Sequence, residues 1–313
     1  MAAAGGGRDG RGASTSGCGL KRRYAATSHE EELNHDQPPV QARSQRWTNG
    51  MDLLRDVTEN KRFLPVGIEG IDKLLGGGLR QGQLTEITGA SSSGKTQLCL
   101  HAASHVVARN MGAVMYLDTS NSFSPSRIAG IIDEFPIPLV GEPKDVRLKR
   151  VMRSINCESV FDIFDLFEVN IGGSKICLLI IDSVSSLLAP IIGGKYPQGR
   201  SMMITVAMIL KKLADEYNLS VLVTNHMVSA GNGTLKPALG QSWKTVPHVR
   251  LMLSHDRGRH ICTATVLKHT LLVYSLVFLA FSIILSVGFW LHYEFRGTQL
   301  ISATWHSRED NNQ

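Results

Sequence analysis

The residues best suited to chemistry form an eight-residue run that fits the phosphate-binding pattern G-x-x-x-x-G-K-[ST]. The run consists of Gly89, Ala90, Ser91, Ser92, Ser93, Gly94, Lys95 and Thr96. Glycines at both ends let the backbone curl, so that its N–H groups and the start of a following helix point at phosphate oxygens. Lys95 is suited to neutralise the β- and γ-phosphates, and the Thr96 hydroxyl is suited to ligate Mg²⁺. The run therefore predicts a site for ATP and magnesium.

The residues on either side of this run have the patterns that a phosphate loop requires. The apolar stretch 84–88 predicts a strand that leads into the loop, and residues 97–108 keep apolar side chains on one helical face beyond it. A serine-rich turn that binds nothing is the alternative interpretation. The flanking strand and helix argue against that alternative.

A second apolar stretch ends in a carboxylate and predicts a residue that assists the metal. Residues 176–181 form a continuous apolar run, and Asp182 follows it directly. Such runs are common in proteins, but this one follows a phosphate loop in a chain of alternating strands and helices. Asp182 is therefore predicted to hold Mg²⁺ through its water shell, beside Thr96.

Beyond Phe63 the chain alternates apolar strand-like stretches with amphipathic helical stretches. The predicted strands are 84–88, 113–118, 151–157, 176–182, 219–224, 248–253 and 261–268, and the predicted helices are 97–108, 126–134, 159–168 and 201–218. This alternation predicts an α/β fold with a mainly parallel twisted sheet and helices on both faces. Ligands of such sheets bind beyond the carboxyl ends of the strands, where the phosphate loop falls.

Composition limits the class of protein. A chain of 313 residues with 43% hydrophobic residues can bury one large core or two small ones. None of the cysteines shows C-x-x-C spacing, and four of the five lie within apolar strand or helix patterns. This usage is typical of reduced, mostly buried thiols in an intracellular protein. The net charge of +6 is compatible with a polyanionic partner, but it is also ordinary for a solvated surface.

The N-terminal residues 1–50 are rich in Gly, Ala, Ser, Arg and Gln and lack apolar periodicity, which predicts a disordered tail. They contain no apolar stretch of the kind found in secretory signals, so export is not expected. Residues 1–28 carry five basic side chains against one acid, as an organellar transit peptide does. Lys21-Arg22-Arg23 is instead compatible with nuclear import, and a tail with no targeting role is the third interpretation.

Several ordered motifs together resemble one known family. Besides the phosphate loop they are GIEGIDKLLGGGL at 67–79, YLDT at 116–119, LVTNH at 222–226 and PALGQSW at 237–243. They resemble the RecA-type recombinase ATPase core, and in detail the D-type paralogues of the eukaryotic strand-exchange recombinase, over about residues 52–269. The resemblance implies a RecA-like phosphate-loop fold and a nuclear role in homologous-recombination repair of DNA double-strand breaks. It also implies ATP and Mg²⁺ as cofactors, and single-stranded DNA, branched DNA and other recombinase paralogue subunits as partners.

The resemblance also implies roles for particular residues. The run Gly89 to Thr96 would bind the triphosphate, and Asp182 would assist Mg²⁺. Asn225 and His226 lie where the family senses the γ-phosphate and relays it to two DNA-binding loops. Those loops would be residues 190–200 and 228–242, with Lys195, Arg200 and Lys236 as their basic residues. Such side chains suit contact with phosphates without sequence reading, and ordinary surface loops are the alternative.

Three features depart from the family pattern. Active members carry a glutamate after the strand-end Asp-Thr to activate the attacking water, whereas this chain has Asp118-Thr119-Ser120. Serine is a poor general base, so the resemblance implies slow DNA-stimulated ATP hydrolysis and leaves no confident catalytic residue. The small N-terminal helical domain of the family is replaced by the predicted tail. The resemblance also ends near His269.

Where the family adds further sheet strands, residues 271–291 form a nearly unbroken apolar segment. Of these 21 residues, 14 are Leu, Ile, Val or Phe and none is charged. As a helix the segment would span about 31 Å, close to the roughly 30 Å hydrocarbon core of a bilayer. Association with a membrane, an aberrant C-terminus and an unrecognised core element are the alternatives. The length of the run argues against a buried strand.

The predicted organisation follows from these features. It is a disordered tail at 1–50, a linker at 51–66, a RecA-like ATP-binding core at 67–269, the apolar segment at 270–292 and a polar tail at 293–313. The leading hypothesis is an ATP-binding, DNA-binding repair subunit. A membrane-anchored nucleotide-binding protein and an organellar DNA recombinase are the two alternatives, and they differ from it in location.

Overall fold

The structure, a computed structural model, describes ten stretches of the chain. They are residues 49–56, 62–135, 143–169, 175–192, 198–230, 233–256, 261–270, 280–282, 291–296 and 299–306. Almost all of the predicted tail at 1–50, most of the apolar segment at 270–292 and the predicted DNA-binding residue Lys195 lie outside these stretches. The predicted linker contains a short helix, α1 (Gly50–Arg55), and a short strand, β1 (Phe63–Leu64), which pairs with β2 (Leu79–Arg80).

Six parallel strands form the centre of the main sheet, in the order β9-β3-β7-β6-β4-β5. Their bounds are β9 (Val249–Asp256), β3 (Leu84–Gly89), β7 (Ser220–Ser229), β6 (Ile176–Asp182), β4 (Ala113–Asp118) and β5 (Ile155–Ser159). The register pairs Gly89 with His226 and Asp118 with Asp182. Because parallel strands end at the same edge of a sheet, these four residues lie along one edge. The predicted mainly parallel α/β fold is confirmed.

Four further strands, mostly paired antiparallel, extend the sheet on the β9 side. They are β10 (Ile261–His269), β11 (Ala280–Ser282), β12 (Leu291–Arg296) and β13 (Gln299–His306), and β10 pairs directly with β9. A further strand, β8 (Leu235–Pro237), folds back against the end of β7. Within the predicted apolar segment, the residues that the structure describes are therefore mostly extended, in β11 and the start of β12. None of the helices in the described stretches is both long and apolar enough to cross a bilayer.

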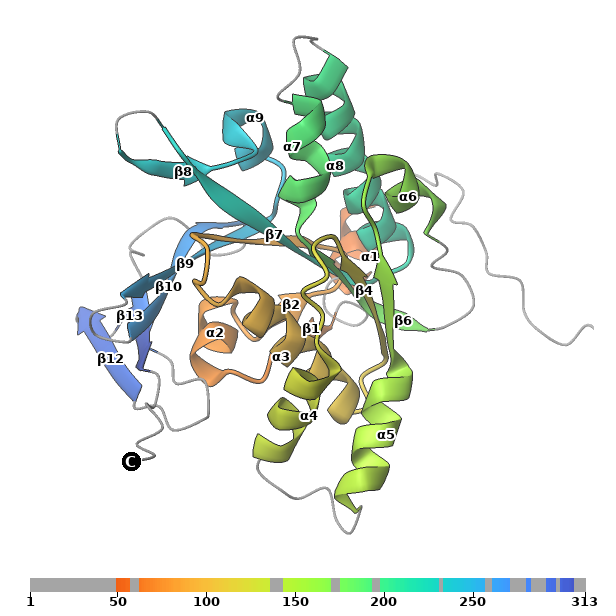
Figure 1. Ribbon diagram of the computed structural model, residues 1–313, viewed down its shortest axis with the longest axis vertical. Coiled ribbons are helices and arrows are strands. Elements are labelled where there is room, and N and C mark those ends of the chain that lie inside the picture. The colour runs from red at the N-terminus through yellow and green to blue at the C-terminus, as the bar shows by residue number, and fades with distance from the viewer. Residues whose placement is uncertain are drawn as a thin grey trace, which may run out of the picture. The chain divides into compact units, whose positions relative to one another are not determined.

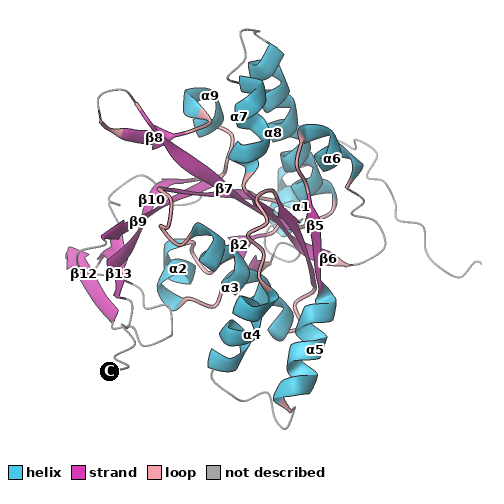
Figure 2. Cartoon of the chain, in the orientation of Figure 1, coloured by secondary structure: helices cyan, strands magenta, loops and turns pink. Residues whose placement is uncertain are grey.

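Helices cover both faces of the central strands (Figures 1 and 2). One face carries α2 (Glu69–Leu74), α3 (Lys95–Ala108), α4 (Pro125–Glu134) and α5 (Lys144–Ser154), and the other carries α6 (Ile163–Glu168), α7 (Val184–Ile192), α8 (Gln198–Glu216) and α9 (Gly240–Lys244). Because successive strand side chains point to opposite faces, one continuous apolar strand serves both cores. In β6, Leu178 and Ile180 pack in the core beneath α3, while Leu179 and Ile181 pack beneath α8.

One predicted strand is wrong. Residues 151–157 are predicted to be extended, but α5 continues to Ser154 and β5 begins only at Ile155. Val151 is fully buried on α5, with Leu148 and Met152 packed partly against the same core. The apolar residues therefore belong to the inward face of a helix before they belong to a strand. A short apolar run does not by itself distinguish these two structures.

Other predicted boundaries also shift. The helix predicted at 159–168 begins at Ile163, because the Asp162 side chain accepts hydrogen bonds from the backbone N–H groups of Phe164 and Asp165 and caps it. The ends of the loop predicted at 190–200 are helical, in α7 and α8. The loop predicted at 228–242 contains the end of β7, β8 and the start of α9. Among the cysteines that the structure describes, Cys99 and Cys177 are buried, Cys262 is half-buried and Cys157 is exposed.

Candidate nucleotide-binding site

The phosphate loop joins the end of β3 to the start of α3. Gly94 adopts a left-handed conformation with φ of 93° at the N-cap of α3, and no side chain caps the helix there. A Cβ atom on Gly89 would collide with the Ser93 side chain and the Leu253 carbonyl oxygen. Glycine is therefore needed at both ends of the loop, once for backbone conformation and once for space.

Lys95 lies inside this loop. Its side chain is only 6% exposed, and its Nζ donates to the carbonyl oxygens of Gly89 at 2.9 Å and Ala90 at 2.7 Å. Burial lowers the pKa of Lys95, and the nearby Asp182 carboxylate opposes that shift. Within the described stretches, the ammonium group thus donates only to neutral carbonyl oxygens. Phosphate oxygens would satisfy it better, since charge-assisted hydrogen bonds are stronger.

The loop passes two further tests of fit for a triphosphate. The Ser93 hydroxyl is buried and has no hydrogen-bond partner among the residues that the structure describes. The first turn of α3 presents backbone N–H groups with no side-chain cap, and the partial positive charge of a helix start favours an anion. A buried cation, an unpartnered hydroxyl and an uncapped helix start together suit a phosphate ligand.

Asp182 is held at the end of β6 by three hydroxyl groups. Thr96 Oγ1 donates to Asp182 Oδ2 at 2.7 Å, Tyr116 Oη donates to the same oxygen at 3.1 Å, and Thr224 Oγ1 donates to Oδ1. Burial, together with nearby acidic groups that include Asp182, raises the pKa of Tyr116, so its hydroxyl stays a donor. The structure thus brings together the two predicted metal-assisting residues, Thr96 and Asp182. Their oxygen atoms are of the kind that Mg²⁺ prefers, so these two residues could hold it.

Sequence reasoning did not identify Tyr116 and Thr224. Both lie on strands that flank β6. Tyr116 lies two residues before Asp118, the last β4 residue paired with β6, and Thr224 directly follows Val223, the last β7 residue paired with β6. Polar residues near the ends of neighbouring parallel strands are the signal that could have found them.

The turn after β4 is organised around Asp118 rather than around Ser120. The Asp118 carboxylate accepts hydrogen bonds from the backbone N–H groups of Ser120 at 3.0 Å, Ser122 at 3.1 Å and Phe123 at 2.8 Å. The Ser120 hydroxyl donates to the Ser122 hydroxyl at 3.2 Å. Asp118 is therefore occupied by holding the turn, and the position after Asp-Thr carries a hydroxyl group in place of a carboxylate.

The predicted sensing pair is divided between two environments. His226 Nε2 lies 2.9 Å from Ser183 Oγ, and the His226 backbone N–H donates to Ser185 Oγ at 3.0 Å. Desolvation and then the proximity of Lys95 lower the pKa of His226. The strand register pairs His226 with Gly89, the first residue of the loop. Asn225 is instead fully buried, and its Nδ2 donates to Glu86 Oε1 at 2.7 Å. The His226 side chain is therefore placed where it could contact a phosphate, whereas the Asn225 side chain faces the protein interior.

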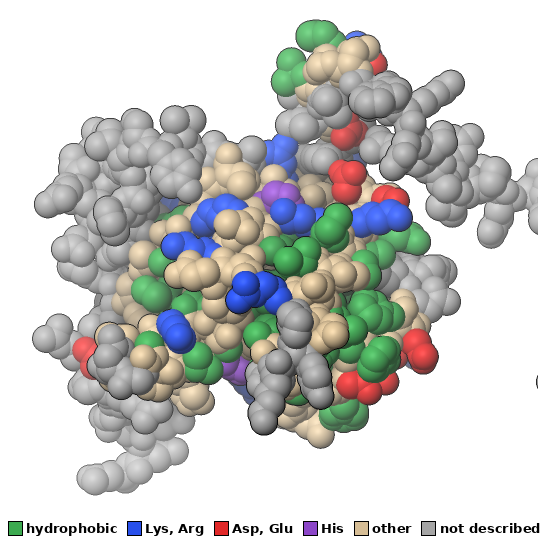
Figure 3. All heavy atoms as spheres, turned by 90° about the horizontal axis from the view of Figure 1, so that it is seen from above, with side chains coloured by type: hydrophobic (Ala, Val, Ile, Leu, Met, Phe, Trp, Pro, Cys, Tyr) green, Lys and Arg blue, Asp and Glu red, His purple; other side chains and the backbone are tan. Residues whose placement is uncertain are grey.

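Two of the three predicted DNA-binding residues lie in described stretches. Arg200 is exposed near the start of α8 and Lys236 is exposed on β8. Lys244, exposed on α9, is not among the predicted residues. Figure 3 shows the face to which these elements belong, with Lys and Arg side chains spread over its described surface. Sequence reasoning missed Lys244 because it falls just beyond the loop predicted at 228–242.

Comparison with known proteins agrees with this architecture. The model of the Rad51 family matches residues 61–270. DNA repair protein RAD51 homolog 4 of Bos taurus is 35% identical over 223 residues, which cover 67% of this chain and 67% of that protein. The protein of the same name from Mus musculus is 32% identical over 217 residues, covering 67% of this chain and 66% of its own length. DNA repair protein RAD51 homolog 2 of Homo sapiens is 29% identical over 234 residues, which cover 71% of this chain and 60% of that protein. The matched part is thus about two thirds of each of these proteins.

Proposed function

The chain belongs to the Rad51 family, and from this premise we propose that it is an ATP-binding, DNA-binding subunit in DNA repair by homologous recombination. The repair role is supported by similarity to relatives that are named as DNA repair proteins. The nucleotide role is carried by one observation. The phosphate loop, with Lys95 buried in it, lies at the same sheet edge as Asp182, and Thr96 is already hydrogen-bonded to that carboxylate.

ATP would bind with its β- and γ-phosphates in the loop. Lys95 Nζ would exchange the carbonyls of Gly89 and Ala90 for phosphate oxygens, and the α3 backbone N–H groups would donate to the same phosphates. When bound, Mg²⁺ would offset the negative charge of the phosphates. Thr96 and Asp182 would hold the metal, Asp182 through water. Hydrolysis would be slow, because Ser120 cannot accept a proton from water as a carboxylate does.

DNA would contact the face that carries β8, α9 and the start of α8. Arg200 and Lys236 are exposed there, and Lys195, the third residue proposed from the sequence, lies outside the described stretches. Isolated cationic side chains contact phosphates without reading bases, so binding to single-stranded and branched DNA would tolerate any sequence. Other members of the family are the proposed protein partners, and the nucleus is the proposed location.

Binding of labelled single-stranded DNA across a salt series tests this proposal. In the full-length chain, Arg200→Ala combined with Lys236→Ala should weaken binding. It should also reduce the slope of log affinity against log salt by about 0.7 for each DNA phosphate that the variant no longer binds. Lys149→Ala is the matched control, since Lys149 is exposed on α5, on the opposite face of the sheet. If the folded double variant keeps the wild-type salt slope, Arg200 and Lys236 do not contact DNA phosphates.

A further inference from the structure

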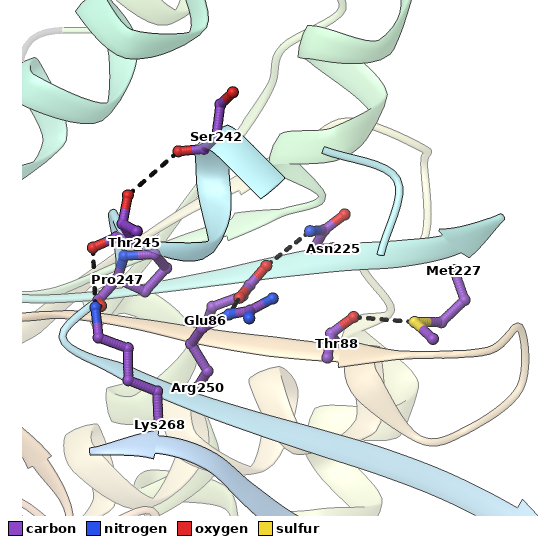
Figure 4. A network of polar contacts seen from close by, with 9 residues as sticks. All are labelled: Glu86, Thr88, Asn225, Met227, Ser242, Thr245, Pro247, Arg250 and Lys268. Carbon is purple, nitrogen blue, oxygen red and sulfur yellow. Dashed lines mark hydrogen bonds and ion pairs between the residues drawn. The ribbon is translucent and has the colours of Figure 1, made fainter. Parts of the chain in front are cut away.

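A charged pair is buried in the centre of the sheet, between the strand that enters the phosphate loop and its neighbour β9 (Figure 4). Glu86 on β3 is 0% exposed and Arg250 on β9 is 3% exposed, and Arg250 Nε donates to Glu86 Oε2. The other carboxylate oxygen, Oε1, accepts from Asn225 Nδ2 at 2.7 Å. Glu86 therefore joins its two neighbouring strands, β9 on one side and β7 on the other.

These side chains lie on one face of the sheet. Leu84 and Val223 pack in the core beneath α6–α9, and strand residues alternate between faces, so Glu86 and Asn225 point to the same side. The apolar cluster on that side includes the fully buried Trp243 of α9. Glu86 and Asn225 are themselves fully buried, so they are shielded from water.

Stability alone is a poor explanation for such a pair. Removing two charges from water costs free energy that their attraction often fails to recover, and apolar replacements of similar volume are frequently neutral or stabilising. The Asn225 amide adds to that cost, because its Oδ1 has no hydrogen-bond partner among the residues described. Because this buried network is incompletely satisfied, we infer that its role is to position the strands that it joins rather than to stabilise the fold.

The network touches the strands that frame the phosphate loop. Glu86 lies on the strand that ends at Gly89, and the Leu253 carbonyl of β9 packs against Gly89 closely enough to exclude a Cβ. Asn225 is followed directly by His226, which bonds to Ser183 beside Asp182. The His226 carbonyl oxygen accepts from the Ala238 N–H at 2.8 Å, just beyond β8. Two hydrogen bonds, joined by the peptide link between Asn225 and His226, thus connect β3 to the exposed β7–β8 hairpin.

We propose that Glu86 and Arg250 are positioning residues that hold Asn225, so that nucleotide in the phosphate loop sets the position of the β7–β8 hairpin and strengthens DNA binding there. The inference rests on the proposed function, since it assigns the coupling between the two ligands to particular residues. Glu86 and Arg250 touch neither ligand. They act by fixing the carboxyl end of β7 relative to β3.

Two variants of the full-length chain separate this role from simple support of the fold. Glu86→Gln keeps an amide oxygen that can accept from Asn225 Nδ2, but it leaves the Arg250 charge without its carboxylate. The double variant Glu86→Leu with Arg250→Met removes both charges at similar volume, and with them the acceptor for Asn225. Loss of one partner of a buried pair is strongly destabilising, whereas apolar replacement of both is tolerated. Glu86→Gln is therefore predicted to lose more stability, and the apolar double variant is predicted to lose more of the positioning of Asn225.

The readout is the affinity for a labelled oligo-dT, measured with and without a non-hydrolysable ATP analogue and Mg²⁺. In the wild type the nucleotide should tighten DNA binding by about 10-fold, within the usual range of coupling between sites. The apolar double variant should melt at the higher temperature of the two and bind the analogue within about threefold of the wild type. Its DNA affinity should nevertheless change by less than about twofold on addition of nucleotide. Glu86→Gln, although less stable, should keep most of the coupling.

Thr85→Val is the matched control, because Thr85 is buried on the same strand and points to the opposite face. It should leave the coupling unchanged. Full coupling in the apolar double variant, with the analogue bound, would overturn this inference alone and leave the proposed function intact. Failure of the wild type to bind the analogue would overturn both. If Glu86→Gln does not fold, the double variant against Thr85→Val still decides the question.

Discussion

The carboxyl ends of β3 and β4 lie at the same edge of the sheet, yet they carry different groups. At the end of β3 the loop buries Lys95, leaves the Ser93 hydroxyl without a partner in the described stretches and leads into an uncapped helix. At the end of β4 the Asp118 carboxylate accepts hydrogen bonds from three backbone N–H groups, and Ser120 stands where the family resemblance implies a glutamate. The first region has groups that suit phosphate binding, and the described turn of the second places a serine hydroxyl after Asp118-Thr119. We therefore expect nucleotide binding and hydrolysis to respond to different substitutions.

The largest expected effect concerns the β4 end. General-base catalysis typically contributes 10²- to 10⁴-fold, so the wild type should hydrolyse ATP slower by roughly that factor than a relative with a carboxylate at this position. Ser120→Glu should raise the rate at saturating ATP·Mg²⁺, measured as phosphate release. Ser126→Glu, an exposed position in the first turn of α4, is the control and should have no effect. A brisk wild-type rate that Lys95→Ala abolishes would show that another residue acts as the base.

The next effect tests the β3 end. Lys95→Ala should weaken ATP binding by on the order of 10²-fold, because a buried triphosphate would lose its charged partner at a cost of several kcal/mol. Isothermal titration of the folded variant measures this weakening. Lys212→Ala, on the exposed side of α8, should bind ATP as the wild type does. If Lys95→Ala binds ATP as tightly as the wild type does, the end of β3 is not the phosphate-binding region.

The smallest effect concerns His226, which lies between the two ends. Its pKa is lowered in the free protein, so the ring is neutral at pH 7. The negative charge of ATP would raise that pKa, so ATP binding would take up a proton, and affinity would increase as pH falls below the ordinary value of about 6.5. His226→Gln keeps a hydrogen-bonding group toward Ser183 but does not titrate. Wild type and variant should therefore differ by only a few-fold, and only at low pH. Identical pH profiles would exclude a contact between His226 and the nucleotide.

Two buried strands could be predicted from the sequence to the residue, whereas β7, predicted at 219–224, runs over Ser220–Ser229. The strands at 113–118 and 176–182 have their predicted bounds, because each is a buried run that ends at a charged residue. The stretch 151–157 could not be assigned correctly, since Val151 and Met152 fit the inward face of α5 as well as they fit a strand. Element type in such short runs is decided by packing against α3 and α4, which a local pattern does not contain.

The candidate site shows the same division. The phosphate loop, Thr96 and Asp182 could be predicted because each belongs to a local motif with a fixed chemical purpose. Glu86 and Arg250 had a weaker signal, a charged residue inside a predicted buried strand, which predicts a buried partner but does not identify it. Asn225 and His226 are neighbours in sequence, and adjacent strand residues point to opposite faces, so one local motif contained two different environments.

The sequence by itself determined the phosphate loop, the parallel core and the missing carboxylate at Ser120, because these depend on residue types within a few positions of one another. Only the tertiary structure decided which side chains meet. Asp182 is held by Thr96, Tyr116 and Thr224, which come from three different elements, and Glu86 is held by residues more than a hundred positions away. These contacts follow from the order and register of parallel strands. That register is set by the packing of whole helices on both faces of the sheet, so short-range patterns do not reveal it.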